Sequence, residues 1–275
     1  MNKYLIALFA SLLLFSCSEE NETKKKEKTT TVVSSNNVPD INFTIVETFP
    51  HDTLSFTEGF LFHDGLLFES TGSPDNIPYT KSVFGPVDLK TGKIDKKAEL
   101  DRSVYFGEGI VFTDGKILQL TYKNQLGFIY DAKTFKKTGQ FTYQNKEGWG
   151  LTTDGKNIIM SDGTSALTYL DPATLKVAKT LNVSENGYAA DYLNELEWIK
   201  GFIYANVWTT NKIVKIDPAT GKVVGKLDCV SLLHEARIKY TNATELNGIA
   251  YDPASDKIYV TGKLWPSIYR IEFPH

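Results

Sequence analysis

The sequence predicts an all-β fold, and three observations lead to this prediction. Helical periodicity is almost absent along the chain. Short runs rich in Val, Ile, Tyr, Phe and Thr alternate with Asp-Gly and Pro turns, as in proteins built from short strands. One repeat unit also begins five times with the same pattern. A polar or aromatic residue comes first, a glycine follows in most units, and an apolar residue comes third. The five starts are Glu58-Gly59-Phe60, Glu108-Gly109-Ile110, Trp149-Gly150-Leu151, Asn194-Glu195-Leu196 and Asn247-Gly248-Ile249.

Each start leads into the same series of strands and turns. The tight turns that follow the five starts are Asp64-Gly65, Asp114-Gly115, Asp154-Gly155, Lys200-Gly201 and Asp256-Lys257. A second strand comes next, then a third that in four units ends in an aspartate turn, and an outer fourth strand closes each unit. Repeats of about 40–50 residues with four strands are typical of propeller blades. The sequence therefore predicts a five-bladed β-propeller over residues 39–275, with about four antiparallel strands per blade.

An all-β sandwich is the alternative fold. Its strands would not restart the same turn pattern five times, so we favour the propeller. Residues 230–244 form a longer insertion with several apolar positions, where we expect a short helix.

The first 38 residues differ from the rest. Lys3 precedes a short apolar run over residues 4–15, which ends just before Cys17. This pattern resembles a bacterial lipobox and predicts a lipoprotein signal peptide over residues 1–16. We expect residues 17–38 to hold the lipidated Cys17 and a flexible polar tether. Acyl chains on Cys17 would anchor the protein in the bacterial cell envelope, on the periplasmic or cell-surface side. The alternative is a buried apolar segment with an incidental cysteine.

Composition argues against several classes of function. The formal net charge of -3 is close to balance, which argues against a nucleic-acid surface. With Cys17 lipidated, only Cys229 remains, so an intramolecular disulfide cannot form. The four histidines are scattered and no cysteine pair accompanies them, which argues against a zinc site. We expect a monomer.

In a propeller, the first strand of each blade lines the central axis, so equivalent positions form a ring. The residues predicted to converge at one mouth of the channel are Glu58, Glu108, Trp149, Asn194 or Glu195, and Asn247. The glycine that follows most of them would let neighbouring backbones approach closely. Carboxylates, an indole and amides that face one another indicate a functional site. Capping of the channel by hydrogen bonds, or by a structural cation, is the alternative.

A cation such as calcium in the channel is the metal site to consider. Glu195 and Glu197 alternate along one strand and therefore face the same side. Carboxylates of this kind can bind calcium. Their spacing is short and follows no known loop signature, so we expect that no cofactor is required.

Several longer motifs resemble one family. They are Phe106-Gly107-Glu108-Gly109-Ile110, Gln119-Leu120-Thr121, Gly148-Trp149-Gly150-Leu151-Thr152-Thr153-Asp154-Gly155, Ser161-Asp162-Gly163, Leu193-Asn194-Glu195-Leu196-Glu197, Tyr204-Ala205-Asn206-Val207-Trp208, Leu246-Asn247-Gly248-Ile249-Ala250-Tyr251-Asp252 and Val260-Thr261-Gly262-Lys263-Leu264-Trp265-Pro266. In this order, and over essentially the whole domain, they resemble the glutamine cyclotransferases of the plant and bacterial type. The resemblance implies a five-bladed propeller that cyclises the N-terminal glutamine of peptides or proteins to pyroglutamate and releases ammonia.

The chain departs from the family pattern at two positions. Tyr122 follows Leu120-Thr121, where the family commonly carries a tryptophan in its substrate pocket. Glu58 stands where the family often has a glutamine. The tyrosine can change the shape of the pocket, and the extra acid can shift the pH profile.

The resemblance and the ring position together assign catalysis to Glu108. Cyclisation joins the α-amine to the γ-carboxamide carbon of the same residue, so the nucleophile is already tethered. The amine must lose a proton and the leaving group must gain one, and one carboxylate can do both in sequence. Lys263 and Asn194 are the candidates that would stabilise the charge growing on the amide oxygen. Rim hydrogen bonding by Glu108 without catalysis is the alternative.

Aromatic residues complete the predicted substrate site. Trp149 and Trp208 would form a slot around the aliphatic stem of the glutamine. Phe56, Phe106 and Tyr122 would surround the same site, and Glu58 would lie beside Glu108, so that apolar burial and a like charge both raise the pKa of Glu108. We expect Trp265, which precedes a proline, to pack in the core.

Two other functions remain open at this point. A propeller can act without catalysis and bind a protein or glycan partner at the cell envelope, because this fold hosts many functions. A metal-dependent hydrolase would need several carboxylates and a histidine or asparagine around one ion, and no histidine falls on the predicted ring.

Overall fold

The computed structural model describes residues 37–275. The predicted signal peptide, the predicted lipidation site at Cys17 and almost all of the predicted tether lie outside the described residues. The described part consists of strands arranged around a central axis and one α-helix, α1 (Val230–Lys239). This helix falls within the insertion where the sequence predicts one, so that expectation is confirmed.

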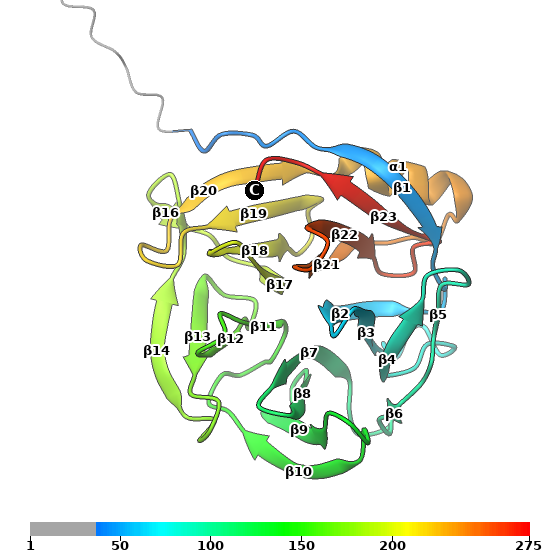
Figure 1. The fold of residues 1–275 in the computed structure, drawn as a ribbon, viewed down its shortest axis with the longest axis vertical. Helices are drawn as coiled ribbons and strands as arrows, with labels where there is room; N and C mark the ends of the chain where they lie inside the picture. The colour runs from blue at the N-terminus through cyan, green and yellow to red at the C-terminus, as the bar shows by residue number, and fades with distance from the viewer. Residues whose placement is uncertain (1–36) are drawn as a thin grey trace, which may run out of the picture. The chain divides into compact units, whose positions relative to one another are not determined.

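Apart from one short hairpin, the strands form five antiparallel sheets of four or five strands, which confirms the predicted five-bladed propeller (Figure 1). Blade 1 contains β2 (Phe56–His63), β3 (Leu66–Gly72), β4 (Val83–Asp88), β5 (Lys93–Ile94) and β6 (Ala98–Glu99). Blade 2 contains β7 (Gly107–Thr113), β8 (Lys116–Thr121), β9 (Leu126–Asp131) and β10 (Lys137–Thr142). Blade 3 contains β11 (Leu151–Thr153), β12 (Ile158–Met160), β13 (Ala166–Leu170) and β14 (Val177–Asn182). Blade 4 contains β17 (Leu193–Ile199), β18 (Phe202–Val207), β19 (Lys212–Ile216) and β20 (Val223–Asp228).

Blade 5 differs from the prediction in the source of its outer strand. It contains β21 (Leu246–Asp252), β22 (Lys257–Gly262), β23 (Ser267–Glu272) and β1 (Thr44–Pro50). The sequence pattern predicts that each unit ends with its own fourth strand, whereas here β1 precedes the first unit and pairs antiparallel with β23. The pairing covers the outer edge of β23, and because β1 leads directly into blade 1, it also joins the first blade to the last.

The hairpin turns have the backbone that their residues favour. Asp64 and Gly65 have φ angles of 48° and 76°, and Lys200 and Gly201 have 46° and 88°. Two consecutive residues with positive φ form the turn whose twist matches that of the strands it joins, and glycine adopts this conformation at little cost. A short hairpin of β15 (Ser184–Glu185) and β16 (Tyr188–Ala189) lies between blades 3 and 4 and was not predicted.

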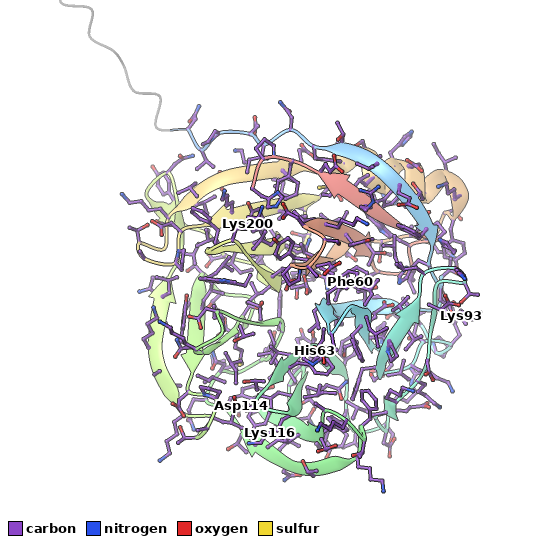
Figure 2. All side chains as sticks on the ribbon, viewed as in Figure 1. Phe60, His63, Lys93, Asp114, Lys116 and Lys200 are labelled. Carbon is purple, nitrogen blue, oxygen red and sulfur yellow. The ribbon has the colours of Figure 1, made fainter. Side chains whose placement is uncertain are left out.

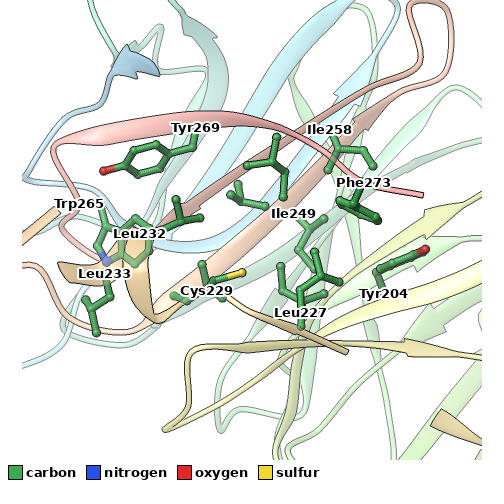
Figure 3. Packing of buried hydrophobic residues seen from close by; sticks show 14 of the residues in the cluster. Tyr204, Leu227, Cys229, Leu232, Leu233, Ile249, Ile258, Trp265, Tyr269 and Phe273 are labelled. Carbon is green, nitrogen blue, oxygen red and sulfur yellow. The ribbon is translucent and has the colours of Figure 1, made fainter. Parts of the chain in front are cut away.

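Five clusters of buried hydrophobic residues lie between successive blades, so each blade is held by two neighbours. The cluster between blades 4 and 5 is closed by α1, whose Leu232 packs with Trp265 and Tyr269 (Figure 3). Trp265 is fully buried, as expected for a packing residue, and Cys229 is buried in the same cluster. Residues 37–275 include no helix that is long and apolar enough to cross a membrane.

The inner strands β2, β7, β11, β17 and β21 surround the axis, and the outer strands form the rim (Figure 1). Phe60 of β2 accordingly lies near the axis, whereas Lys93 of β5 lies at the periphery (Figure 2). Residues at the start of each inner strand are therefore placed at one end of the channel.

Candidate active site

A cavity of about 240 Å³ lies where the inner strands begin. Its walls are formed by Phe56, Glu58, Pro74, Phe106, Glu108, Tyr122, Trp149, Asn194, Trp208, Glu245 and Lys263. All nine residues that the sequence assigns to catalysis or substrate binding are among these. The structure thus brings together residues from all five blades and their connections.

Irregular pairing between the first and second strands accompanies the ring positions. The register of β2 against β3 shifts between Thr57 and Gly59, and that of β7 against β8 shifts between Gly107 and Ile110. Shifts also occur at Asn194 in β17 and at Asn247 in β21. A β-bulge re-aims a side chain out of the regular alternation. The bulges therefore allow Glu58 and Glu108 to point toward the cavity.

Two glycines confirm the close approach predicted around the axis. A Cβ atom on Gly109 would lie 2.7 Å from the backbone oxygen of Trp149, and one on Gly150 would lie 2.3 Å from that of Asn194. Larger side chains would force neighbouring blades apart. The glycines hold blades 2, 3 and 4 close enough for their ring residues to share one cavity.

A buried ion pair crosses the cavity floor between Glu58 and Lys263. The Lys263 Nζ donates a hydrogen bond of 2.7 Å to Glu58 Oε1, and the two side chains are 7% and 3% exposed. The other oxygen of Glu58 accepts a hydrogen bond of 3.1 Å from Asn247 Nδ2. Asn247, predicted on the ring, thus lies behind Glu58 and orients it. Lys263 also lies 4.6 Å from the ring centre of Phe56.

Glu108 lies beside this pair in a desolvated position. It is 4% exposed, and Lys263 donates its hydrogen bond to Glu58 rather than to Glu108. Burial raises the pKa of Glu108 well above its ordinary value, and the negative charges of Glu58 and Glu147 raise it further, while Lys263 opposes them. Burial also raises the pKa of Glu58, to about 7, despite its bond to Lys263. Because both pKa values are raised, each carboxyl can hold a proton at a higher pH than an exposed glutamate does.

Trp149 and Trp208 form one wall of the cavity. Their rings lie 5.5 Å apart, edge to face, at an interplanar angle of 83°. The Trp149 Nε1 donates a hydrogen bond of 3.0 Å to Glu147 Oε2, and the same indole packs against Gly163. The opposite wall has Phe106 between Phe56 and Tyr122, with ring centres 6.2 and 5.7 Å away. These walls leave a slot suited to an aliphatic chain.

Asn194 offers its side-chain amide to the cavity. It is 3% exposed, and its Oδ1 has no hydrogen-bond partner among residues 37–275. A buried polar atom without a partner is costly, so such an atom in a cavity wall indicates a place where a ligand completes the hydrogen bonding.

Glu195 and Glu197 lie deeper in the channel and form hydrogen bonds between blades. Glu195 accepts hydrogen bonds of 3.2 and 2.8 Å from the backbone N–H groups of Phe60 and Ile249, and Glu197 accepts one of 2.8 Å from Tyr251. Burial raises the pKa of Glu197 to about 8 and that of Glu195 well above its ordinary value. Among residues 37–275, no group of three or more His, Cys, Asp or Glu is arranged to hold a metal ion. Calcium requires several oxygen ligands, and the cation that the sequence allows in the channel stays a prediction.

Sequence reasoning missed two acids at the site. Glu245 lines the cavity and Glu147 orients Trp149. Each lies two residues before a ring position, namely Asn247 and Trp149. The repeat could have revealed them if the position two residues upstream of each start had been compared across the units.

Comparisons with known proteins identify the family of the chain. A family model for glutamine cyclotransferases matches residues 9–273. A glutaminyl-peptide cyclotransferase from Arabidopsis thaliana is 41% identical over 231 residues, which are 83% of this chain and 70% of that protein. The crystal structure of Myxococcus xanthus glutaminyl cyclase superimposes with a TM-score of 0.78 at 32% identity, over 86% of this chain and 98% of that one. The chain belongs to the glutamine cyclotransferase family.

Proposed function

We propose that this protein is a glutaminyl-peptide cyclotransferase, an acyltransferase that converts N-terminal glutamine to pyroglutamate and releases ammonia. The observation that carries the proposal is the buried Glu108, with its raised pKa, in an aromatic cavity beside the Glu58–Lys263 ion pair. Membership in the family supports the same activity.

Glu108 acts as the proton shuttle in this proposal. The α-amine nitrogen bonds to the side-chain carboxamide carbon of the glutamine, and Glu108 takes the proton that the amine loses. Glu108 then returns a proton to the carboxamide nitrogen, whose bond to carbon breaks as ammonia leaves. A base is most effective when its pKa lies near the working pH, which is the direction in which burial moves Glu108.

Lys263 and Asn194 stabilise the negative charge on the carboxamide oxygen. Lys263 donates one of its three N–H groups to Glu58, which leaves two for other partners. A cation that is held in place in a buried site stabilises the developing oxyanion more than one in bulk water does. The Nδ2 of Asn194 can donate a second hydrogen bond to that oxygen, whereas its unpartnered Oδ1 is an acceptor for an N–H group of the substrate. Glu58 thereby has a positioning role, because it holds the Lys263 ammonium in place.

The aromatic walls select the substrate. The slot between the two walls fits the two methylene groups of glutamine, and Trp149 can also contact the α-amine through a cation–π interaction. No step of this proposal passes through a metal ion. Attachment through Cys17, a place in the bacterial cell envelope and a monomeric state remain proposals from the sequence.

Ammonia release from a glutamine-initiated peptide tests the activity. We expect the purified protein to release one ammonia per peptide and to form a five-membered lactam, followed by a coupled ammonia assay and mass spectrometry. An asparagine-initiated peptide is the matched control, because loss of one methylene would require a strained four-membered ring. If the glutamine peptide stays unchanged, the protein is a binding propeller, and a protein or glycan ligand becomes the function to seek.

Replacement of Glu58 should move the pH profile. In Glu58→Gln, a negative charge beside Glu108 is lost and Lys263 is free to attract it, so the pKa of Glu108 falls. Because Glu108 must be ionised to act as a base, the acidic limb of kcat/KM should move to lower pH, by about one unit or more. The measurement is kcat/KM for glutamine amide between about pH 4 and pH 9, a range that extends on both sides of the neutral pH at which such groups act. An unchanged or upward-shifted acidic limb would contradict the assignment.

A further inference from the structure

We propose that Trp208 and Tyr192 extend the cavity wall at Trp149 into an aromatic strip, and that the outer part of this strip binds the second and third residues of the peptide substrate. The strip would favour aromatic and large apolar side chains at these positions. This inference rests on the proposed function and extends it to the part of the substrate beyond the reacting glutamine.

The three rings lead from the cavity to the surface. The ring centre of Trp208 lies 5.5 Å from that of Trp149 and 5.9 Å from that of Tyr192. The exposed fraction rises along this line, from 9% at Trp149 to 36% at Trp208 and 51% at Tyr192. Exposed aromatic surface that continues a binding cavity is typical of a recognition site, because it supplies apolar contact at a small entropic cost.

The backbone around the strip is held in an unusual conformation. Tyr192 has a φ of 67° and Thr209, next to Trp208, has a φ of 65°. Positive φ is rare for residues with bulky or branched side chains and is retained where the surroundings impose it, often at functional sites. Here Tyr192 N–H donates to Gly163 O over 2.9 Å, and Trp208 N–H donates to Tyr192 O over 2.8 Å. These bonds tie the backbones of the two aromatic segments together, and the ring of Tyr192 packs beside that of Trp208, which lines the cavity.

The chemistry of the substrate requires such a path. The α-amine must lie inside the cavity near Glu108, so the rest of the peptide has to leave through the open side. An extended chain advances about 3.3–3.6 Å per residue. Two or three residues beyond the glutamine therefore span a distance like that from Trp149 across Trp208 to Tyr192, which places positions 2 and 3 over the strip.

The test compares three substrates: glutamine amide, Gln-Gly-Gly-amide and Gln-Phe-Phe-amide. For the wild type, we expect kcat/KM to be about 3- to 10-fold higher for the phenylalanine peptide than for the glycine peptide, as one or two aromatic contacts provide. In Tyr192→Asn this ratio should fall toward one. Asparagine tolerates positive φ, so the variant removes the ring without adding strain to the backbone. Tyr192→Phe should keep the preference because it keeps the ring.

Tyr188→Asn is the matched control, since Tyr188 is 78% exposed on the hairpin of the same interblade connection. Its preference should equal that of the wild type. Similar rates of cyclisation by the wild type for all three substrates would overturn the proposal. A preference for the phenylalanine peptide that is the same in Tyr192→Asn as in the wild type would also overturn it. A wild type inactive even on glutamine amide would overturn the proposed function, and this inference with it.

Discussion

Replacing Glu108 by glutamine should reduce kcat/KM for a glutamine-initiated peptide by about 10²- to 10⁴-fold, the range that a general acid–base group contributes. The substitution keeps the size of the side chain and removes its ability to carry a proton. Folding should be retained, because a carboxyl whose pKa is raised by burial gains little from ionisation in the native state. The measurements are ammonia release and urea unfolding of the same preparation.

Glu235→Gln provides the control for this experiment. Glu235 is a surface acid on α1 that pairs with Lys239, so its loss should leave both activity and stability unchanged. A Glu108→Gln protein as active as the wild type would assign proton transfer to another group, with Glu58 the nearest candidate. A Glu108→Gln protein that is inactive because it is unfolded would be recognised from its unfolding curve.

Replacing Trp265 by alanine should lower the free energy of unfolding by about 3–5 kcal/mol, as for other large side chains removed from a core. Trp265 is fully buried between blades 4 and 5 and packs edge to face against Tyr269, with ring centres 6.0 Å apart. Its Nε1 also donates a hydrogen bond of 3.1 Å to Thr244 O, which the variant would leave unpartnered. The measurement is the midpoint of urea unfolding, monitored by far-UV circular dichroism because the variant changes the tryptophan fluorescence.

Trp265→Phe separates the two causes of this loss. It keeps most of the buried ring and removes the hydrogen bond, so we expect a smaller decrease than for alanine. A Trp265→Ala protein with the stability of the wild type would contradict the packing seen in Figure 3. The exposed Tyr188→Asn variant should differ from the wild type by about 0.5 kcal/mol or less.

The acids of the site illustrate how far sequence reasoning reaches. Glu58 and Glu108 open repeat units, so their shared position at the channel mouth follows from the repeat alone. Their electrostatic relation does not, because Glu58 is bonded to Lys263, a residue 205 positions away. Glu147 and Glu245 each lie two residues before a unit, so the repeat carries their position, but their contacts with Trp149 and with the cavity exist only in the folded protein.

The sequence by itself determined the blade count, the short helix and the ring positions at the channel mouth. These depend on local periodicity and on turn chemistry, which each segment carries in its own residues. Tertiary structure alone decided that β1 completes blade 5, that bulges aim the ring residues, and that Lys263 pairs with Glu58 while Glu108 remains beside them. Such contacts join distant segments, and their strength depends on burial, which exists only once the blades have packed around the axis.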